Sequence, residues 1–173
     1  LHEAGGETNE SGVTSVRGTI YRVASLGADA RAEVIDGSVE VRNGLGRVAL
    51  EAGTGTVFST GSAPTAPTPL LAPPVLAELP SSLRLAQKPP SFPAVPGAAA
   101  YRQQYAGDAN FDLPLSDLRT EDTLLHIPAL TAGDYFLRVR AIDSLGLEGR
   151  DTVRALRLQQ LLPAPDACAP ADG

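Results

Sequence analysis

The stretch Gly133-Asp-Tyr-Phe-Leu-Arg-Val-Arg-Ala-Ile-Asp-Ser-Leu-Gly-Leu-Glu-Gly149 decides the fold class. Apolar side chains at positions 135, 137, 139 and 141 alternate with Arg138 and Arg140. This period of two is typical of a β-strand with one buried face, and the glycines that follow indicate a turn. A similar stretch, Val13-Thr-Ser-Val-Arg-Gly-Thr-Ile-Tyr-Arg-Val23, anchors the N-terminal part of the chain.

Further strands follow from the same alternation. Residues 37–51 predict a hairpin in which Val39 and Val41 share one face, and Asn43-Gly44 is expected to supply the positive φ angles of a tight turn. Other predicted strands cover residues 32–35, 54–59, 83–85, 100–106, 124–127, 135–142 and 152–158. No segment has helical periodicity, so the sequence predicts an all-β protein.

Glycine and proline divide the chain. Residues 1–61 hold eleven of the seventeen glycines and no proline, whereas residues 62–96 hold ten of the fifteen prolines. We therefore predict a first β domain at 1–61 that opens with a loop at 1–12. A stiff proline-rich linker is expected at 62–80, a second β domain at 81–160 and a disordered tail at 161–173. Leucines in the later half of the linker predict that it packs on a neighbouring domain.

Composition argues against several functions. The net charge of −6 and the lack of a large basic patch make nucleic acid an improbable partner. No run approaches the roughly 18 apolar residues of a membrane helix, so no membrane span is expected in this fragment. Cys168 stands alone in the tail, which excludes a disulfide within the chain. It is interpreted as incidental, with intermolecular pairing or attachment as the alternative.

Residues suited to catalysis or metal binding are few. His2 lies near the start, and His126 is predicted to face solvent from the strand at 124–127. The segment Asp108-Ala-Asn-Phe-Asp112 imitates the start of a calcium loop, but Leu113 and Arg119 occupy the places of its glycine and glutamate, so a turn is preferred. The sequence predicts no catalytic residues, no cofactor and no metal, hence no enzyme.

The N-terminal part resembles the FecR domain, whose hallmark is a VRGT-x-[FY]-x-V strand. The matching elements are Val16-Arg-Gly-Thr-Ile-Tyr-Arg-Val23, Glu33-Val-Ile-Asp-Gly-Ser-Val-Glu-Val41 and Leu50-Glu-Ala-Gly-Thr-Gly55, in that order. The resemblance covers about residues 13–61 and implies a β-sandwich or roll, with a β-solenoid-like form as the alternative. The part that usually precedes the VRGT element is cut short, so we expect an N-terminally incomplete domain.

The C-terminal part resembles a fibronectin type III-like domain, an immunoglobulin-like β-sandwich. Residues 91–102 are similar to its opening W-x-x-V-x-G-A-x-x-Y pattern, with Phe92-Pro93 in place of the tryptophan. Residues 130–141 are similar to the strand that carries a tyrosine corner at Tyr135. The smaller aromatic core is expected to draw on Tyr101, Phe111 or Phe136, and Gly18 and Tyr21 are expected to be structural in the first domain.

These resemblances imply an envelope protein of a Gram-negative bacterium, periplasmic, outer-membrane-associated or secreted, of the kind often preceded by LysM modules. We expect a non-enzymatic binding or adaptor function in protein–protein recognition, including cell-surface signalling, through unpaired strand edges. Arg17, Arg138 and Arg140 are the candidate partner contacts, although the architecture favours a salt bridge from Arg17 to an acid such as Glu33 or Asp36. The alternative is binding of peptidoglycan or polysaccharide, with Tyr101, Tyr105 or Tyr135 stacking on sugar rings.

Overall fold

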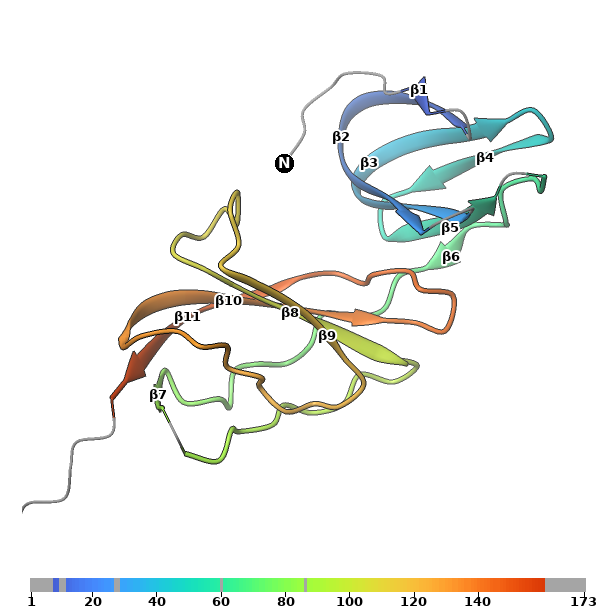
Figure 1. The fold of residues 1–173 in the computed structure, drawn as a ribbon. Coiled ribbons are helices and arrows are strands. Elements are labelled where there is room, and N and C mark those ends of the chain that lie inside the picture. The colour runs from blue at the N-terminus through green and yellow to red at the C-terminus, as the bar shows by residue number, and fades with distance from the viewer. Residues whose placement is uncertain (1–7, 10–11, 27–28, 60, 86, 161–173) are drawn as a thin grey trace, which may run out of the picture.

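The computed structural model describes residues 8–9, 12–26, 29–59, 61–85 and 87–160, with the side chains of residues 8–9, 12–18 and 26 left out. Strands β1 to β11 within these ranges form two sheets, one for each half of the chain (Figure 1). The protein is all-β, as the alternation predicts. The described part contains no helix that would be long and apolar enough to cross a membrane.

The first sheet has the order β1-β2-β3-β5-β6, and β4 pairs with β3 beside β5. Its strands are β1 (Thr8–Asn9), β2 (Gly12–Leu26), β3 (Asp29–Asn43), β4 (Gly46–Glu51), β5 (Thr54–Ser59) and β6 (Thr68–Pro69). The long strands β2 and β3 bend, so that the sheet curls around its own apolar face (Figure 1). That face buries Val34, Val39, Val41, Leu50 and Phe58.

The predicted hairpin is present as β3 and β4, but the explanation of its turn was wrong. Neither Asn43 nor Gly44 has a positive φ angle. Instead the Oδ1 atom of Asn43 accepts hydrogen bonds from the N–H groups of Leu45 and Gly46, at 3.0 and 3.1 Å. A side-chain turn of this kind needs no left-handed backbone, because the asparagine amide takes the place of a backbone carbonyl.

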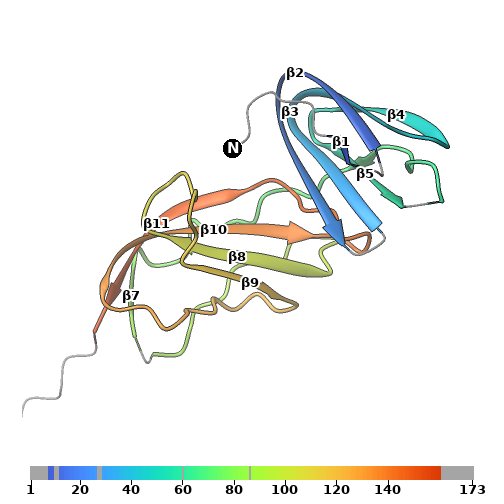
Figure 2. The same ribbon diagram turned by 45° about the horizontal axis from the view of Figure 1, so that its top comes forward.

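The second sheet has the order β7-β11-β10-β8-β9, and β9 is its outer strand (Figure 2). Its strands are β7 (Ser82–Arg84), β8 (Ala100–Ala106), β9 (Ser116–Thr120), β10 (Gly133–Ile142) and β11 (Thr152–Gln159). The strand predicted at 124–127 was wrong: this segment forms one isolated bridge, between Leu124 and Ser91. In a sandwich, a second sheet would cover this one. Here the segments around Ser91 and Leu124 cover it without forming a regular sheet.

The alternation along β10 is confirmed. Leu137, Val139 and Ala141 are buried in the second core, which also holds the edge-to-face pair of Phe92 and Tyr101, with ring centroids 5.0 Å apart. Phe111 is buried on the opposite face of the sheet, beneath the guanidinium of Arg138, which lies 4.2 Å from the ring centroid. Phe111 is thus buried, as expected of a core residue, but it lies outside the cluster of Phe92 and Tyr101, because the β8–β9 loop folds onto the arginine side of the sheet.

The segment between the sheets contributes to both of them. Thr68 and Pro69 form β6 on the edge of β5, and the Leu71 carbonyl accepts a hydrogen bond from the N–H of Arg150 at 3.2 Å. Farther along, Leu76 and Leu79 enter the second core, with 2% and 5% of their surfaces exposed. The proline-rich segment is consequently fixed at both ends by hydrogen bonds and apolar packing.

Candidate functional site

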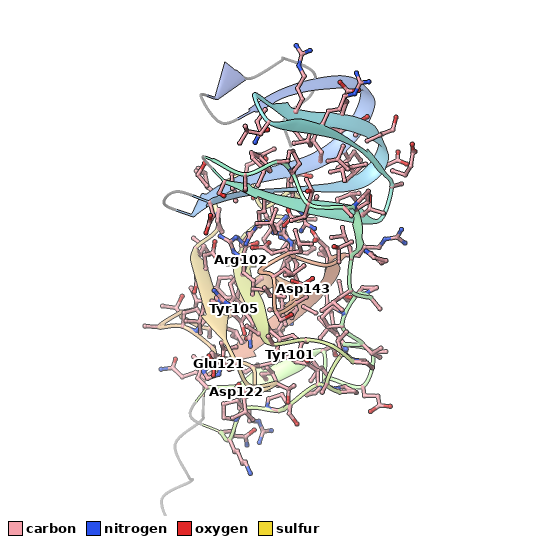
Figure 3. All side chains as sticks on the ribbon, turned by 90° about the vertical axis from the view of Figure 1, so that its right-hand side faces the viewer. Tyr101, Arg102, Tyr105, Glu121, Asp122 and Asp143 are labelled. Atoms are coloured by element: carbon pink, nitrogen blue, oxygen red, sulfur yellow. The ribbon has the colours of Figure 1, made fainter. Side chains whose placement is uncertain are left out.

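Charged side chains from both halves of the chain meet where the two sheets face each other. We call them the junction cluster: Arg22 and the pair Arg31 and Glu33 from β2 and β3, Arg102 and Arg140 from β8 and β10, and Glu148 and Asp151 from the segment before β11. In the first sheet these residues lie on the face away from the core, because Arg22 pairs across the strands with Glu33. Figure 3 shows Arg102 directly beside the first domain.

Glu148 lies at the centre of the cluster. Its Oε1 accepts hydrogen bonds from Arg31 at 2.5 Å and Arg102 at 2.8 Å, and its Oε2 accepts one from Arg140 at 2.8 Å. Burial alone would raise the pKa of Glu148, but the hydrogen bond from Arg140 and the charges of Arg102 and Arg31 outweigh it and lower the pKa to about 2. The carboxylate is ionised at every physiological pH.

Glu33 is fully buried in the same cluster, yet its environment has the opposite effect. Its Oε1 lies 2.9 Å from Nε of Arg31 and accepts the backbone N–H of Glu148 at 3.0 Å. Its Oε2 is buried without a hydrogen-bond partner in the described residues and lies 3.6 Å from Nε of Arg22. Burial raises the pKa of Glu33, although the Glu148 N–H and both arginines oppose the shift.

Arginines also bind the backbone across the junction. Arg22 donates to the carbonyls of Glu148 and Gly149, at 2.8 and 2.7 Å, and to Asp151 at 3.2 Å. Arg31 donates to the Gly146 carbonyl at 2.7 Å. Planar guanidinium groups can serve several acceptors at fixed angles, so these bonds define both the distance and the orientation between the domains.

An apolar contact completes the junction. Leu147 is 1% exposed and packs on Gly55 of β5, where an added Cβ would lie 3.1 Å from the leucine. At Gly149 an added Cβ would lie 2.6 Å from the Leu71 carbonyl, so no side chain fits there. Gly55 thus permits the close approach of the two domains, and Gly149 permits that of the connecting segment.

Two of the predicted contact arginines lie in or beside this junction. Arg140 is 8% exposed and donates to Glu148 and to Asp151, at 2.8 and 2.6 Å. Arg138 stacks on Phe111 and donates to Gln104 at 2.9 Å. Arg140 is thus occupied within the chain, and Arg138 keeps only part of its surface for a partner.

The third predicted contact, Arg17, and the neighbouring Gly18 lie outside the described side chains. Their backbone belongs to β2, whose pairing with β3 is irregular between Arg17 and Ile20. Opposite this irregularity, Gly37 adopts a φ of +81°, and an added Cβ would lie 2.6 Å from Oγ1 of Thr19. Tyr21 is half-buried and packs against the first core.

Two of the three aromatic candidates for sugar stacking are buried in the core. Tyr101 and Tyr105 are 3% and 1% exposed, and the Tyr101 hydroxyl accepts the N–H of Val95 at 2.8 Å. Burial raises the pKa of Tyr105. Tyr135 is half-buried and donates to the Thr131 carbonyl at 3.1 Å, which is the geometry of a tyrosine corner. Neither Tyr101 nor Tyr105 has a face available to a sugar ring.

His126 lies in a loop rather than on the predicted strand, with 39% of its side chain exposed. Its Nε2 is 2.9 Å from the Asp122 carboxylate and 3.3 Å from the Thr120 hydroxyl. Because the nearby carboxylate engages the same ring nitrogen as the hydroxyl, His126 is poorly arranged to deprotonate Thr120.

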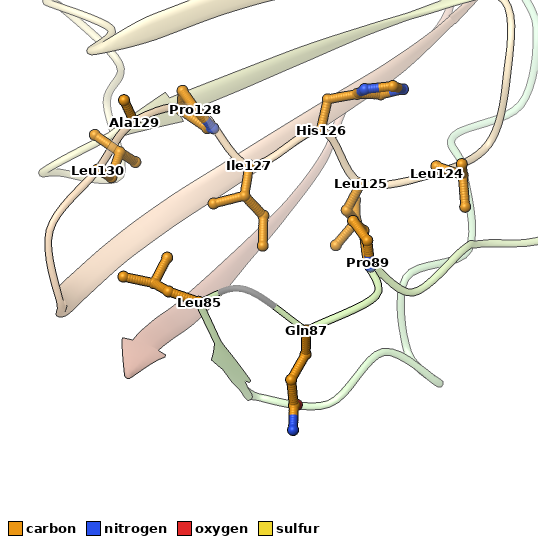
Figure 4. Close-up of a pocket in the computed structure, with 10 residues that line it drawn as sticks. All are labelled: Leu85, Gln87, Pro89, Leu124, Leu125, His126, Ile127, Pro128, Ala129 and Leu130. Atoms are coloured by element: carbon orange, nitrogen blue, oxygen red, sulfur yellow. The ribbon is translucent and has the colours of Figure 1, made fainter. Parts of the chain in front are cut away.

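The other polar loops are structural. Oδ1 of Asp108 accepts the N–H groups of Asn110 and Phe111, at 2.9 and 3.2 Å, which closes the turn preferred over a calcium loop. No group of three or more metal-ligating side chains occurs in the described ranges. At the distal end of the second domain, an apolar hollow of about 490 Å³ is lined by residues 124–130 with Leu85, Gln87 and Pro89 (Figure 4).

Most residues of the junction cluster were not predicted as functional from the sequence. Arg22, Arg31, Glu33, Arg102, Glu148 and Asp151 were each visible as charged residues in or beside predicted strands. A weak signal was present, since outward charges of both signs occur in both halves of the chain. It gave no means of pairing them, because Arg31 and Glu148 are separated by 117 residues.

Fold and junction together define a two-domain all-β protein whose domains are joined by buried salt bridges. The sequence matches no protein-family model and no curated protein. A similar solved structure is described as the extracellular domain of a hybrid two component system from B. thetaiotaomicron, with 11% identity and a TM-score of 0.31. The match covers 88% of this chain and 29% of that one, and at this level of similarity it assigns neither a family nor a function.

Proposed function

We propose that this protein is a non-enzymatic binding or adaptor module of the bacterial envelope, of the FecR-domain type. In this proposal it acts in the periplasm, at the outer membrane or outside the cell of a Gram-negative bacterium. Its β domains recognise a protein partner, and cell-surface signalling is the process that best suits such a module. The observation that carries the proposal is the junction cluster.

The junction supports an adaptor because it holds two surfaces at one distance and orientation. Glu148 alone binds three arginines, one of them from the first domain. Replacing one of these arginines while Glu148 stays buried would cost roughly 3–5 kcal/mol, so the docked arrangement depends on these partners. A module that is preorganised in this way loses less entropy when it binds.

The open edge of β2 is the surface we assign to the partner. β2 pairs with β3 along its length, but on its other side β1 covers only Gly12 and Val13 within the described residues. Ile20 and Val23 are 45% and 44% exposed along this strand. An unpaired strand edge with apolar side chains suits the addition of a strand from a partner.

The test is a pull-down from envelope extract with the intact chain and with Val23→Lys. A lysine beside the edge removes the apolar contact and opposes strand addition. The matched control is Val153→Lys in β11, because Val153 is 45% exposed and belongs to the other sheet. We expect the wild type and Val153→Lys to retain the same envelope protein and Val23→Lys to lose it at least tenfold.

Sedimentation with purified peptidoglycan is run alongside the pull-down. If the chain sediments with peptidoglycan and retains no protein, wall binding replaces the proposed function. Equal retention by Val23→Lys and Val153→Lys would move the contact away from β2. Circular dichroism of both variants checks that the substitutions leave the fold intact.

A further inference from the structure

The outer edge of β9 is a second unpaired strand edge, on the other domain. β9 is the last strand of the second sheet and pairs only with β8 in the described part of the chain (Figure 2). Natural edges are usually blunted by charge or covered, since an open edge can pair with another chain. Exposed leucines lie in and before this strand: Leu113, Leu115 and Leu118 are 83%, 56% and 39% exposed.

The sequence of β9 is complementary to itself. When two copies of Ser116-Asp-Leu-Arg-Thr120 run antiparallel around Leu118, each Asp117 lies opposite Arg119 of the other copy. Leu118 then meets its own counterpart, and Ser116 lies opposite Thr120. Opposite charges and apolar pairs directly across two strands stabilise an antiparallel ladder.

Other registers of the same pairing are unfavourable. Residues that face each other in an antiparallel ladder must have the same hydrogen-bonding orientation, so a two-fold pairing centres on a residue. Centring it on Asp117 places two carboxylates opposite each other, and centring it on Arg119 places two guanidinium groups opposite each other. The register around Leu118 is the one that pairs opposite charges along this strand.

The charges around Arg119 favour an incoming carboxylate. Arg119 lies directly across from Arg102 in the β8–β9 ladder and is exposed. Arg102 already binds Asp117, at 2.7 and 2.5 Å, and Glu148, at 2.8 Å, whereas no ion pair of Arg119 is formed with any residue that the structure describes. Arg119 and Arg102 carry like charges and repel each other across the ladder. A carboxylate from a second β9 would offset this repulsion.

Asp117 can supply that carboxylate without leaving its present partners. Its oxygens accept hydrogen bonds from Arg102 and, at 2.8 Å, from Gln104, and 34% of its side chain is exposed. A carboxylate accepts about four hydrogen bonds, so one site remains for Arg119 of a second copy. Although burial opposes it, hydrogen bonding to Arg102 and Gln104 lowers the pKa of Asp117, which keeps the group ionised.

We propose that the β9 edge is a self-association site, at which β9 of a second copy pairs antiparallel around Leu118 and joins the two second-domain sheets into one. The contact uses neither β2 nor the junction cluster, so it goes beyond the function proposed above. A five-residue strand with neighbouring leucines makes a small interface, and small interfaces give weak, reversible dimers.

Sedimentation equilibrium on the intact chain, from micromolar to millimolar concentration, tests the proposal. We expect a monomer–dimer equilibrium that Leu118→Lys weakens at least tenfold. Leu45→Lys is the matched control, because Leu45 is 61% exposed in the β3–β4 turn and lies on the other domain. A wild type that stays monomeric throughout, or a dimer that Leu118→Lys leaves unchanged, would overturn the proposal.

Two charge reversals test the register. Asp117→Lys and Arg119→Asp each place like charges opposite each other in a homodimer, so each alone is expected to weaken association at least tenfold. Mixed together, the two variants restore opposite charges at both positions and should form a heterodimer. Failure of the mixture to associate, with both variants folded by circular dichroism, would contradict the proposed register.

Cross-linking gives an independent readout. In a Cys168→Ser background, Leu118→Cys places two thiols across the two-fold axis, at a Cα separation of about 4.5–5.5 Å that a disulfide can span. Mild oxidation should then give a covalent dimer of Leu118→Cys and not of Leu45→Cys. Equal cross-linking of both variants would show random encounter and would count against a site at β9.

Discussion

Glu33 and Glu148 are the same residue type in the same cluster, yet their surroundings act in opposite directions. Both side chains are nearly inaccessible, at 1% and 3% exposure. Glu148 receives hydrogen bonds from three arginines, which more than offset its loss of water. Among the described residues, one oxygen of Glu33 has no hydrogen-bond donor, and burial dominates its pKa. The number of donors that reach a carboxylate therefore decides whether its loss of water raises the pKa or its hydrogen bonds lower it.

Glu148 should make stability depend on pH. Its pKa is lowered from 4.5 to about 2 in the folded state, so its contribution is complete above about pH 4.5 and is lost as the pH falls through about 2. This difference corresponds to about 3 kcal/mol. We expect Glu148→Gln to lose about that much stability at neutral pH, and the gap to the wild type should close across this window.

Urea unfolding of both proteins at a series of pH values measures the gap. The control is Glu121→Gln, an exposed glutamate just after β9, for which little change is expected at any pH. A gap between wild type and Glu148→Gln that stays constant down to about pH 2 would contradict the assignment of the stabilising charge to Glu148.

Turns at the element scale differ in what they require of glycine. The β3–β4 hairpin turns through the Asn43 side chain, so Gly44 has an ordinary φ angle, and no atom of the described residues lies within 4 Å of an added Cβ. Gly37 has a φ of +81° and faces Thr19 across the bulged part of β2. The sequence alone does not distinguish the two glycines, whereas their backbone conformations differ.

Alanine substitution should therefore affect the two glycines in opposite directions. Gly44→Ala is expected to be neutral or to stabilise the fold by about 0.5 kcal/mol, because it reduces the entropy of the unfolded chain. Gly37→Ala is expected to cost at least about 1–2 kcal/mol, since alanine disfavours left-handed backbone. Thermal unfolding of both variants measures the effect. A clear loss of stability in Gly44→Ala would contradict the side-chain turn and support the predicted turn with positive φ angles.

At the scale of the whole molecule, the two domains are joined by several independent contacts. The connecting segment adds β6 to the first sheet and Leu76 to the second core, and Thr152 donates to the Pro74 carbonyl at 2.5 Å. The junction cluster adds salt bridges between the sheets. We expect this combination to suppress independent rotation of the domains.

Residual dipolar couplings should therefore fit one alignment tensor for both sheets in the wild type. In the double variant Arg22→Ala/Arg31→Ala, the first domain loses its donors to Glu148 and to the carbonyls of the second domain. We expect two distinct tensors for that variant. Arg42→Ala/Arg47→Ala, which removes two exposed arginines from the β3–β4 hairpin, is the control and should keep one tensor. Two tensors in the wild type would refute a fixed junction.

The sequence by itself determined the fold class and many strand limits, since β5 and β8 begin and end at the predicted residues. Alternation is a property of the local backbone, because successive side chains of a strand point to opposite faces. The tertiary structure alone decided the junction cluster, the face on which Phe111 is buried and the turn at Asn43. Those features depend on which surfaces meet after folding, and partners such as Arg31 and Glu148 lie too far apart in the chain for any local pattern to pair them.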